Sequence, residues 1–155
     1  MPNEYSGSVP QQPTRFAVVV SEYNRSITAK LLDGAVTTLT EHGIPDDQID
    51  VAWVPGAWEI PVVAARLVRG GSYDAVISLG AVIRGETTHD QYINDAVSRG
   101  LSELALETGV PMLFGVLTCN TLEQAIHRSG GNQGNKGVES AEAALKMVDL
   151  LAKLP

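Results

Sequence analysis

The chain has 155 residues, of which 44% are hydrophobic, and it carries a formal net charge of −7 at pH 7. This length fits one globular domain with its own core, and the negative charge argues against nonspecific binding of nucleic acid. The lone cysteine, Cys119, excludes an internal disulfide, and no apolar run is long enough to span a membrane.

The chain begins with a polar segment that contains Pro2, Pro10 and Pro13. Such a segment offers little apolar surface for a core. We expect residues 1–14 to form an arm that is flexible or docked on a neighbouring subunit, and residues 15–155 to form a single domain. Because the segment lacks the basic and apolar regions of a signal peptide, the expected location is cytoplasmic.

Four short apolar runs alternate with helical patterns along the rest of the chain. The runs are nearly continuous, which is typical of parallel strands buried on both faces, and they cover residues 16–20, 51–54, 75–79 and 112–117. Apolar residues three or four positions apart predict helices over residues 26–42, 58–69, 88–108 and 136–153. Thr121 and Gln124 form a capping box that starts another short helix. This order predicts an α/β three-layer sandwich, flavodoxin-like, with a four-stranded parallel sheet and helices on both faces.

In an open parallel sheet, ligands bind beyond the carboxyl ends of the strands. The informative stretches are therefore residues 21–26, 55–59, 80–89 and 118–121, which follow the four apolar runs. We expect all four to converge at one edge of the sheet.

The stretch 80–89, "GAVIRGETTH", reads as a loop that leads into a helix. Thr88 and Gln91 fit a second capping box, which places His89 in the first helical turn. The helix dipole favours a neutral imidazole there, and a neutral imidazole at a crevice can take and return a proton. Gly80 and Gly85 permit close approach of the backbone. The alternative, a solvated helix start with an incidental histidine, stays open from these residues alone.

The stretch 130–137, "GGNQGNKG", is a glycine-rich segment that ends in Lys136 where the last helix begins. Its spacing does not match a Walker A loop. With Arg128 just before it, the segment offers two cations beside a helix N-terminus, which suits a phosphate. A plain Gly-Asn turn is the alternative.

Aromatic side chains follow two of the strands. Tyr23 and Trp58 are placed to stack on a planar heterocycle, although Trp58 could equally pack inward. Phe114 lies within an apolar run, where core packing is the alternative. His42 and His127 are interpreted as structural or solvated, and no spacing of His, Cys or carboxylates resembles a metal site.

Taken together, the motifs resemble the lumazine synthase family over residues 16–153. The matching stretches are "VPGAWEIP", "GAVIRGETTH", "FGVLTCNTLEQAIHR" and "GNKGVESAEAAL". The resemblance implies a transferase of riboflavin biosynthesis that needs no metal or organic cofactor. It would condense 5-amino-6-(D-ribitylamino)uracil with 3,4-dihydroxy-2-butanone 4-phosphate to give 6,7-dimethyl-8-ribityllumazine.

The resemblance also implies roles for individual residues. Tyr23 and Trp58 would flank the pyrimidine ring, and His89 would be the proton shuttle. Phe114 would reach the same site from an adjacent subunit of a pentamer. The remaining assignments are Ala57 and Glu59 to the ribityl chain, Ala81, Val82 and Ile83 to the ring edge, and Glu86, Thr87, Arg128 and Lys136 to the phosphate.

The chain departs from the family pattern in a few places. Asp90 and Gln91 stand where members commonly show an aromatic residue and an acid, and Asp90 puts a negative charge beside His89. Tyr23 and Trp58 replace commoner phenylalanines.

The resemblance implies that the chain assembles with itself as a homopentamer, and the short "GGNQGNKG" link resembles members that form a sixty-subunit icosahedral cage. Riboflavin synthase is a possible partner, and neither nucleic acid nor membrane is expected. The alternatives are a noncatalytic flavin or lumazine carrier and a shell protein on the same scaffold. A response-regulator receiver is rejected, because the required acidic cluster is missing.

Overall fold

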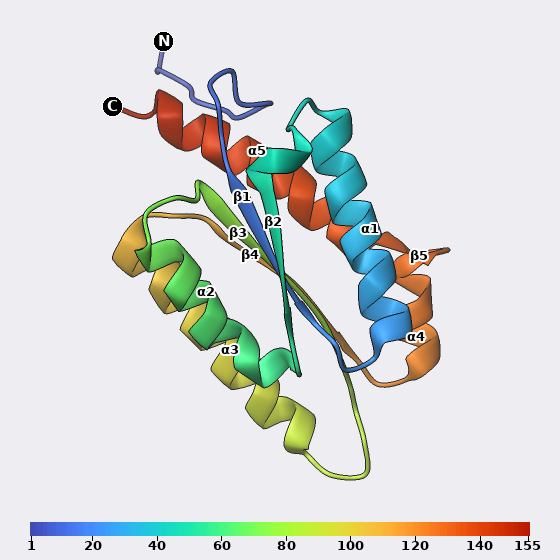
Figure 1. Cartoon of the computed structure of the whole chain (residues 1–155). Coiled ribbons are helices and arrows are strands. Elements are labelled where there is room, and N and C mark those ends of the chain that lie inside the picture. Colours follow the sequence, from blue (N-terminus) through green and yellow to red (C-terminus); the bar gives the residue numbers. More distant parts are fainter.

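A four-stranded parallel sheet forms the middle layer of the computed structural model, which describes residues 1–155 (Figure 1). The strands, in the spatial order β2-β1-β3-β4, are β1 (Phe16–Ser21), β2 (Ile49–Val54), β3 (Ala75–Ile83) and β4 (Met112–Cys119). One face is covered by α2 (Ile60–Arg69) and α3 (His89–Thr108), and the other by α1 (Arg25–Glu41) and α5 (Lys136–Lys153). Shorter elements are η1 (Asp46–Gln48), η2 (Ala57–Glu59), α4 (Leu122–His127), β5 (Ser129–Gly131) and β6 (Gly134–Asn135). The predicted fold class is confirmed, and none of the helices combines the length and hydropathy that a membrane crossing requires.

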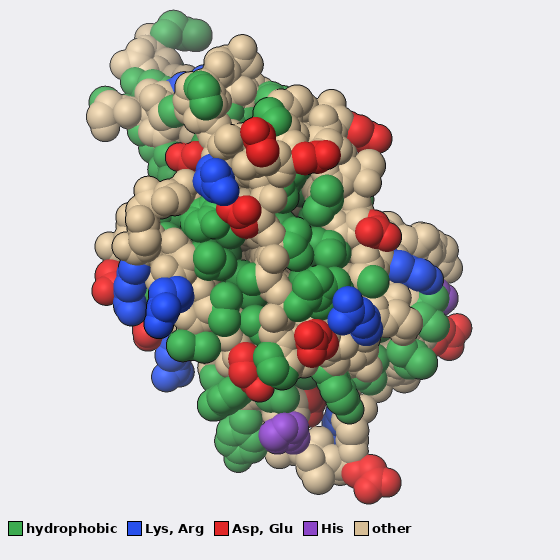
Figure 2. Space-filling view, viewed as in Figure 1, with side chains coloured by type: hydrophobic (Ala, Val, Ile, Leu, Met, Phe, Trp, Pro, Cys, Tyr) green, Lys and Arg blue, Asp and Glu red, His purple; other side chains and the backbone are tan.

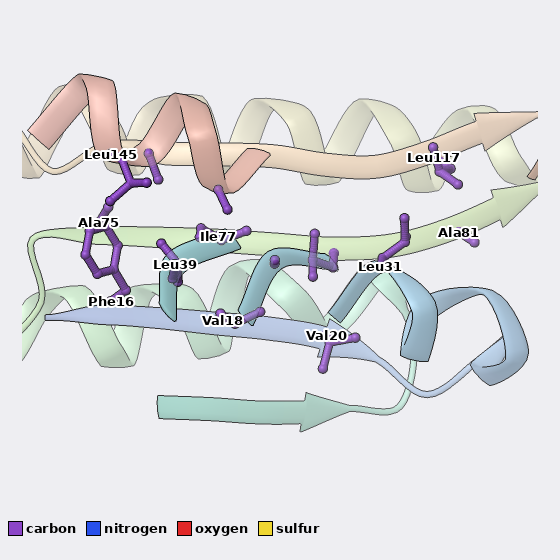
Figure 3. Packing of buried hydrophobic residues seen from close by; sticks show 14 of the residues in the cluster. Phe16, Val18, Val20, Leu31, Leu39, Ala75, Ile77, Ala81, Leu117 and Leu145 are labelled. Atoms are coloured by element: carbon purple, nitrogen blue, oxygen red, sulfur yellow. The ribbon is translucent and has the colours of Figure 1, made fainter. Parts of the chain in front are cut away.

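The two central strands are buried on both faces, as their continuous apolar runs predict. Every residue of β1 is buried, and eight of the nine residues of β3 are buried. Alternate side chains of β1 enter two separate cores, one under each helical layer. Figure 3 shows Phe16 and Val18 in the first core with Leu31 and Leu39 of α1 and Leu145 of α5. These cores fix the sheet between its helices and hold the strand ends in place.

The prediction that all four strands are buried on both faces is wrong for the edge strands β2 and β4. In β2 only Val54 is buried, and Val51 is 42% exposed. The reason is position, because β2 pairs only with β1 and β4 pairs only with β3. Figure 2 shows hydrophobic side chains gathered around β2 and flanked by charged ones. An apolar strand edge of this kind is a surface on which another chain can pair.

β3 is longer than its apolar run predicts. Residues 80–83 were expected in the loop, but the strand continues through them. These residues pair with β4, and the last pair is Ile83 with Cys119. Arg84 extends the contact by donating its N–H to the Cys119 carbonyl at 2.8 Å. The loop before α3 is therefore short, and the end of β3 itself reaches the region of the predicted site.

The two predicted capping boxes have opposite outcomes. At Thr121 the cap is present, because Thr121 Oγ1 accepts from the Gln124 N–H at 3.2 Å. Gln124 also reaches back, but its Oε1 accepts from the N–H of Asn120, the residue before the cap, at 2.8 Å. At Thr88 it is absent. Thr88 has φ −86° and ψ 17°, rather than the extended backbone that lets a capping side chain fold back. Instead, Thr87 Oγ1 accepts from the His89 N–H at 3.3 Å.

The glycine-rich segment forms the short β5–β6 hairpin, and α5 begins at Lys136 as predicted. Asn135 caps this helix, since its Oδ1 accepts from the Gly137 N–H at 2.8 Å. Its Nδ2 donates to the Lys30 carbonyl of α1 at 3.1 Å. One asparagine therefore joins the hairpin, the start of α5 and α1.

The arm lies against α5 of its own chain over residues 6–8. The Ser8 N–H donates to Asp149 Oδ2 at 2.7 Å, and Lys153 Nζ contacts the same oxygen at 2.7 Å. Lys153 also donates to the Ser6 carbonyl at 3.2 Å. Hydrogen bonds from Lys153 and then from the Ser8 amide lower the pKa of Asp149. Docking of the arm on a neighbouring subunit stays a prediction.

We expect Asp149→Asn to destabilise the chain at neutral pH but not in acid. A carboxyl whose pKa is lower in the folded state contributes stability above its unfolded pKa of about 3.9, and this contribution is lost as pH falls through the folded pKa. Urea midpoints of the variant and the parent should differ at pH 7 and converge below about pH 4. The exposed Glu142→Gln, on the same helix, is the control and should leave the midpoint nearly unchanged. A constant difference at all pH values would contradict the charge-based account.

Candidate active site

The carboxyl ends of β1, β2 and β3 surround a hollow of about 540 Å³, which we call the first hollow. Tyr23 follows β1, Trp58 follows β2, and His89 starts α3 after β3. Nine of the predicted site residues line it, namely Tyr23, Ala57, Trp58, Glu59, Ala81, Val82, Ile83, Thr87 and His89. The rule that ligands bind beyond strand ends therefore locates this part of the site.

Backbone hydrogen bonds hold the two aromatic loops of the first hollow together. The Tyr23 N–H donates to the Pro55 carbonyl at 3.1 Å. The next residue, Asn24, has a left-handed backbone with φ 62°, and its Nδ2 donates to the Ala81 carbonyl of β3 at 2.9 Å. Sequence reasoning missed Asn24, although asparagine is among the few residues that adopt this conformation readily. It ties the β1 loop to the end of β3.

Both aromatic side chains are open to solvent at the hollow. Tyr23 is 73% exposed and Trp58 is 59% exposed. The alternative in which Trp58 packs inward is therefore wrong, because Ala57 of η2 and Ile60 at the start of α2 are buried and Trp58 between them lies outside. Two exposed rings at one hollow provide flat faces for a planar ligand.

The two glycines of this region differ. A Cβ added at Gly80 would lie 3.1 Å from Ser21 Oγ, so the predicted close approach holds there, between β3 and β1. A Cβ added at Gly85 would meet no protein atom within 4 Å. No part of the protein approaches Gly85 closely, and because Gly85 lines the hollow, the absence of a side chain there leaves space for a ligand.

The carboxylates of Glu59 and Asp90 are the charged groups of the first hollow, which His89 also lines. No lysine or arginine lines it. A phosphate would be repelled here unless cations arrived from elsewhere, whereas N–H and O–H donors would be attracted. Sequence reasoning placed Asp90 beside His89 but did not predict that it lines the hollow.

The predicted cations lie at a second hollow of about 500 Å³, beyond β4. Phe114, Arg128 and Lys136 line it together, and Glu86 lines neither hollow. The hairpin brings the two cations together, because the Lys136 N–H donates to the Arg128 carbonyl at 2.9 Å. Phe114 is 38% exposed on this edge strand, so the alternative in which it packs in the core is wrong.

Only three of the four strand-end stretches meet at the first hollow. The fourth contributes Thr118 and Cys119 to the second. The separation has a physical cause, because α4 and the start of α5 turn to the opposite face of the sheet from α2 and α3. Sequence reasoning missed Gln133 and Glu139 at the second hollow. The position of Glu139, one turn after Lys136 on α5, could have indicated it.

Other reactive groups lie outside the first hollow. Cys119 is buried and free, and no group of His, Cys, Asp and Glu side chains could hold a metal ion. The His42 ring nitrogen Nδ1 lies 2.7 Å from the Thr38 carbonyl, as the structural interpretation of this histidine expects.

A network of charged and hydroxyl groups joins the amino-terminal ends of β1, β2 and β3, at the edge opposite to the first hollow. Asp50 Oδ2 accepts from Tyr73 at 2.7 Å and from Arg15 at 2.7 Å. The hydrogen bonds from Tyr73 and Arg15 lower the pKa of Asp50, and the hydrogen bond to Asp50 raises the pKa of Tyr73. These groups fix the strand register rather than the site.

Comparison with known families supports the chemistry that the motifs suggest. The family model described as 6,7-dimethyl-8-ribityllumazine synthase matches residues 13–152. The matched range contains every residue of both hollows.

Proposed function

The chain belongs to the 6,7-dimethyl-8-ribityllumazine synthase family of transferases, and on that premise we propose that it condenses 5-amino-6-(D-ribitylamino)uracil with 3,4-dihydroxy-2-butanone 4-phosphate. The product is 6,7-dimethyl-8-ribityllumazine, and phosphate and water are released. The observation that supports the proposal is that the chain has two separate hollows of different character. The first has aromatic side chains and two carboxylates, and the second has Arg128 and Lys136.

The two hollows suit different substrates. The first offers Tyr23 and Trp58 as faces for the pyrimidine and Glu59 as an acceptor for ribityl hydroxyls. The second offers Arg128 and Lys136 for the phosphate of the ketone. Opposite charges at the two hollows would sort the substrates as they bind.

The proposed reaction needs both hollows at one place, and a neighbouring subunit can supply the second. Phe114, Arg128 and Lys136 share one surface, so a neighbour that contributes Phe114 would bring both cations with it. We propose a homopentamer, as the family resemblance implies, and sedimentation velocity of the purified chain would test for it. A monomer with full activity would contradict the shared site.

Alignment of the substrates would provide most of the rate. Holding two reactants in a productive geometry can contribute about 7–11 kcal/mol. The amine then attacks the ketone, and water leaves as the imine forms. Elimination of phosphate leaves an enol that tautomerises to a new carbonyl group, and the second amine closes the ring on this carbonyl with release of another water. His89, at the first hollow, would take up and return protons during the elimination of phosphate.

We therefore expect His89→Ala to keep substantial activity. The turnover number should fall roughly tenfold to thirtyfold, less than the 10²–10⁴-fold typical of general acid–base catalysis. Steady-state rates of lumazine formation, corrected for the uncatalysed reaction, would measure the effect. His127→Ala is the matched control, because His127 lies near Glu123 on α4 and outside both hollows. Complete loss of activity with intact fold and assembly would refute the dominance of alignment.

The proposed function is tested by mixing both substrates with the purified chain and following lumazine formation above the uncatalysed background. Catalysis supports the proposal. Tight binding of the lumazine or of riboflavin without turnover would instead indicate a carrier.

A further inference from the structure

Asp90 occupies an unusual position in the first hollow. It lies in the first turn of α3, next to His89, and lines the hollow. Its Oδ1 atom is covered by the protein but has no hydrogen-bond partner. The carboxylate can therefore meet a donor only through Oδ2.

No neighbouring group of the helix satisfies this carboxylate. Asn94, one turn further along α3, also has a covered Oδ1 without a partner. A carboxylate without a protein donor remains free to accept a proton or a hydrogen bond from a bound substrate.

Asp90 has a simpler possible role, because an acid in the first turn stabilises a helix through its dipole. That role requires neither a covered oxygen nor a place on the wall of a hollow. It also predicts that loss of the charge changes stability slightly and catalysis not at all. The two roles are therefore separable by experiment.

The charges of the first hollow indicate which substrate Asp90 meets. The hollow contains Glu59 and Asp90 but no lysine or arginine, so the phosphate group of the ketone is disfavoured beside Asp90, while its neutral carbonyl end is not. A pyrimidine amine presents N–H donors and becomes positively charged when it attacks a carbonyl. A carboxylate stabilises that developing charge.

We propose that Asp90 accepts the proton of the attacking amine and delivers it to the ketone oxygen, an inference that rests on the proposed function. The amine lone pair forms the new C–N bond, the carbonyl π pair moves to oxygen, and the proton passes from nitrogen to Asp90 Oδ2 and then to that oxygen. In the next step Asp90 takes the remaining N–H proton and gives it to the departing hydroxyl. Water leaves, the imine forms, and the carboxylate is restored.

The test is steady-state kinetics of Asp90→Asn, which keeps the shape of the side chain and removes its charge. We expect the turnover number to fall about tenfold, below the usual 10²–10⁴-fold range because alignment dominates. KM for both substrates should change less than about threefold, because the interaction forms chiefly in the transition state. Asp90→Glu, which retains the carboxylate, should recover part of the rate and serves as the test variant if the asparagine variant does not fold.

Asp95→Asn is the matched control, with the same charge change on the same helix at an exposed position outside both hollows. A turnover number of Asp90→Asn within twofold of the parent would overturn the inference, as would an equal loss in Asp95→Asn or a rise in KM alone. Failure of the parent chain to form any lumazine is a different result. It would reject the proposed function, and the inference would fall with it.

Discussion

Gly137→Ala is expected to lower the free energy of unfolding by about 3 kcal/mol, the upper end of the usual cost of overpacking a core. An ideal Cβ at this position would overlap the Leu31 carbonyl oxygen of α1 and lie 2.7 Å from the Leu31 carbonyl carbon. Both are backbone atoms inside a helix, so no side-chain rotation relieves the overlap. The first turn of α5 would have to move away from α1.

Chemical denaturation of the variant and the parent would measure this loss. For a chain of this size, thermal scans should show the midpoint falling by about 6–12 °C. Gly70→Ala is the control, because Gly70 is exposed, has φ −70°, and an added Cβ would lie 3.4 Å from the Leu67 carbonyl, an ordinary contact. If both variants were equally stable, the close packing of α1 on α5 would not be the reason for the glycine.

The layered fold could be predicted because its signals are local. The continuous apolar runs of β1 and β3 and the helical spacing around Leu31 and Leu145 each reflect a buried face. The edge positions of β2 and β4 could not be predicted in this way. Whether a strand is central or at an edge depends on which strands pair, and the apolar run of one strand does not reveal its pairing partners. The extension of β3 to Ile83 was missed for the same reason, since its last residues are held by β4.

The site, like the fold, could be predicted only in part. Strand ends indicated Tyr23, Trp58 and His89, which do line one hollow. The expectation that Arg128 joins them ignored the face of the sheet on which each following helix packs. That choice is made by the crossover connections and not by any residue near the strand end. The proposed completion of the site by a second subunit is still harder to predict, because the distances between residues of two subunits are not encoded in the pattern of one chain.

The largest catalytic effect is expected for Arg128→Ala. Arg128 and Lys136 are the two cations of the second hollow. A charge-assisted hydrogen bond to a phosphate contributes about 1.5–3 kcal/mol, so KM for the ketone phosphate should rise roughly tenfold to a hundredfold. KM for the pyrimidine should stay nearly constant. Some phosphate affinity should persist, because Lys136 remains in place and its backbone is held by hydrogen bonding rather than by the arginine side chain.

Steady-state kinetics with each substrate varied in turn would separate the two KM values. Arg69→Ala is the matched control, because Arg69 forms a surface ion pair with Glu107 at 3.1 Å and lines neither hollow. It should leave both KM values unchanged. A rise in KM for the pyrimidine alone would show that Arg128 does not hold the phosphate. In that case the two substrates could not be sorted by the charges of the two hollows. Without a role for Arg128, the positive charge of Lys136 would be offset by the carboxylate of Glu139, which lines the same hollow.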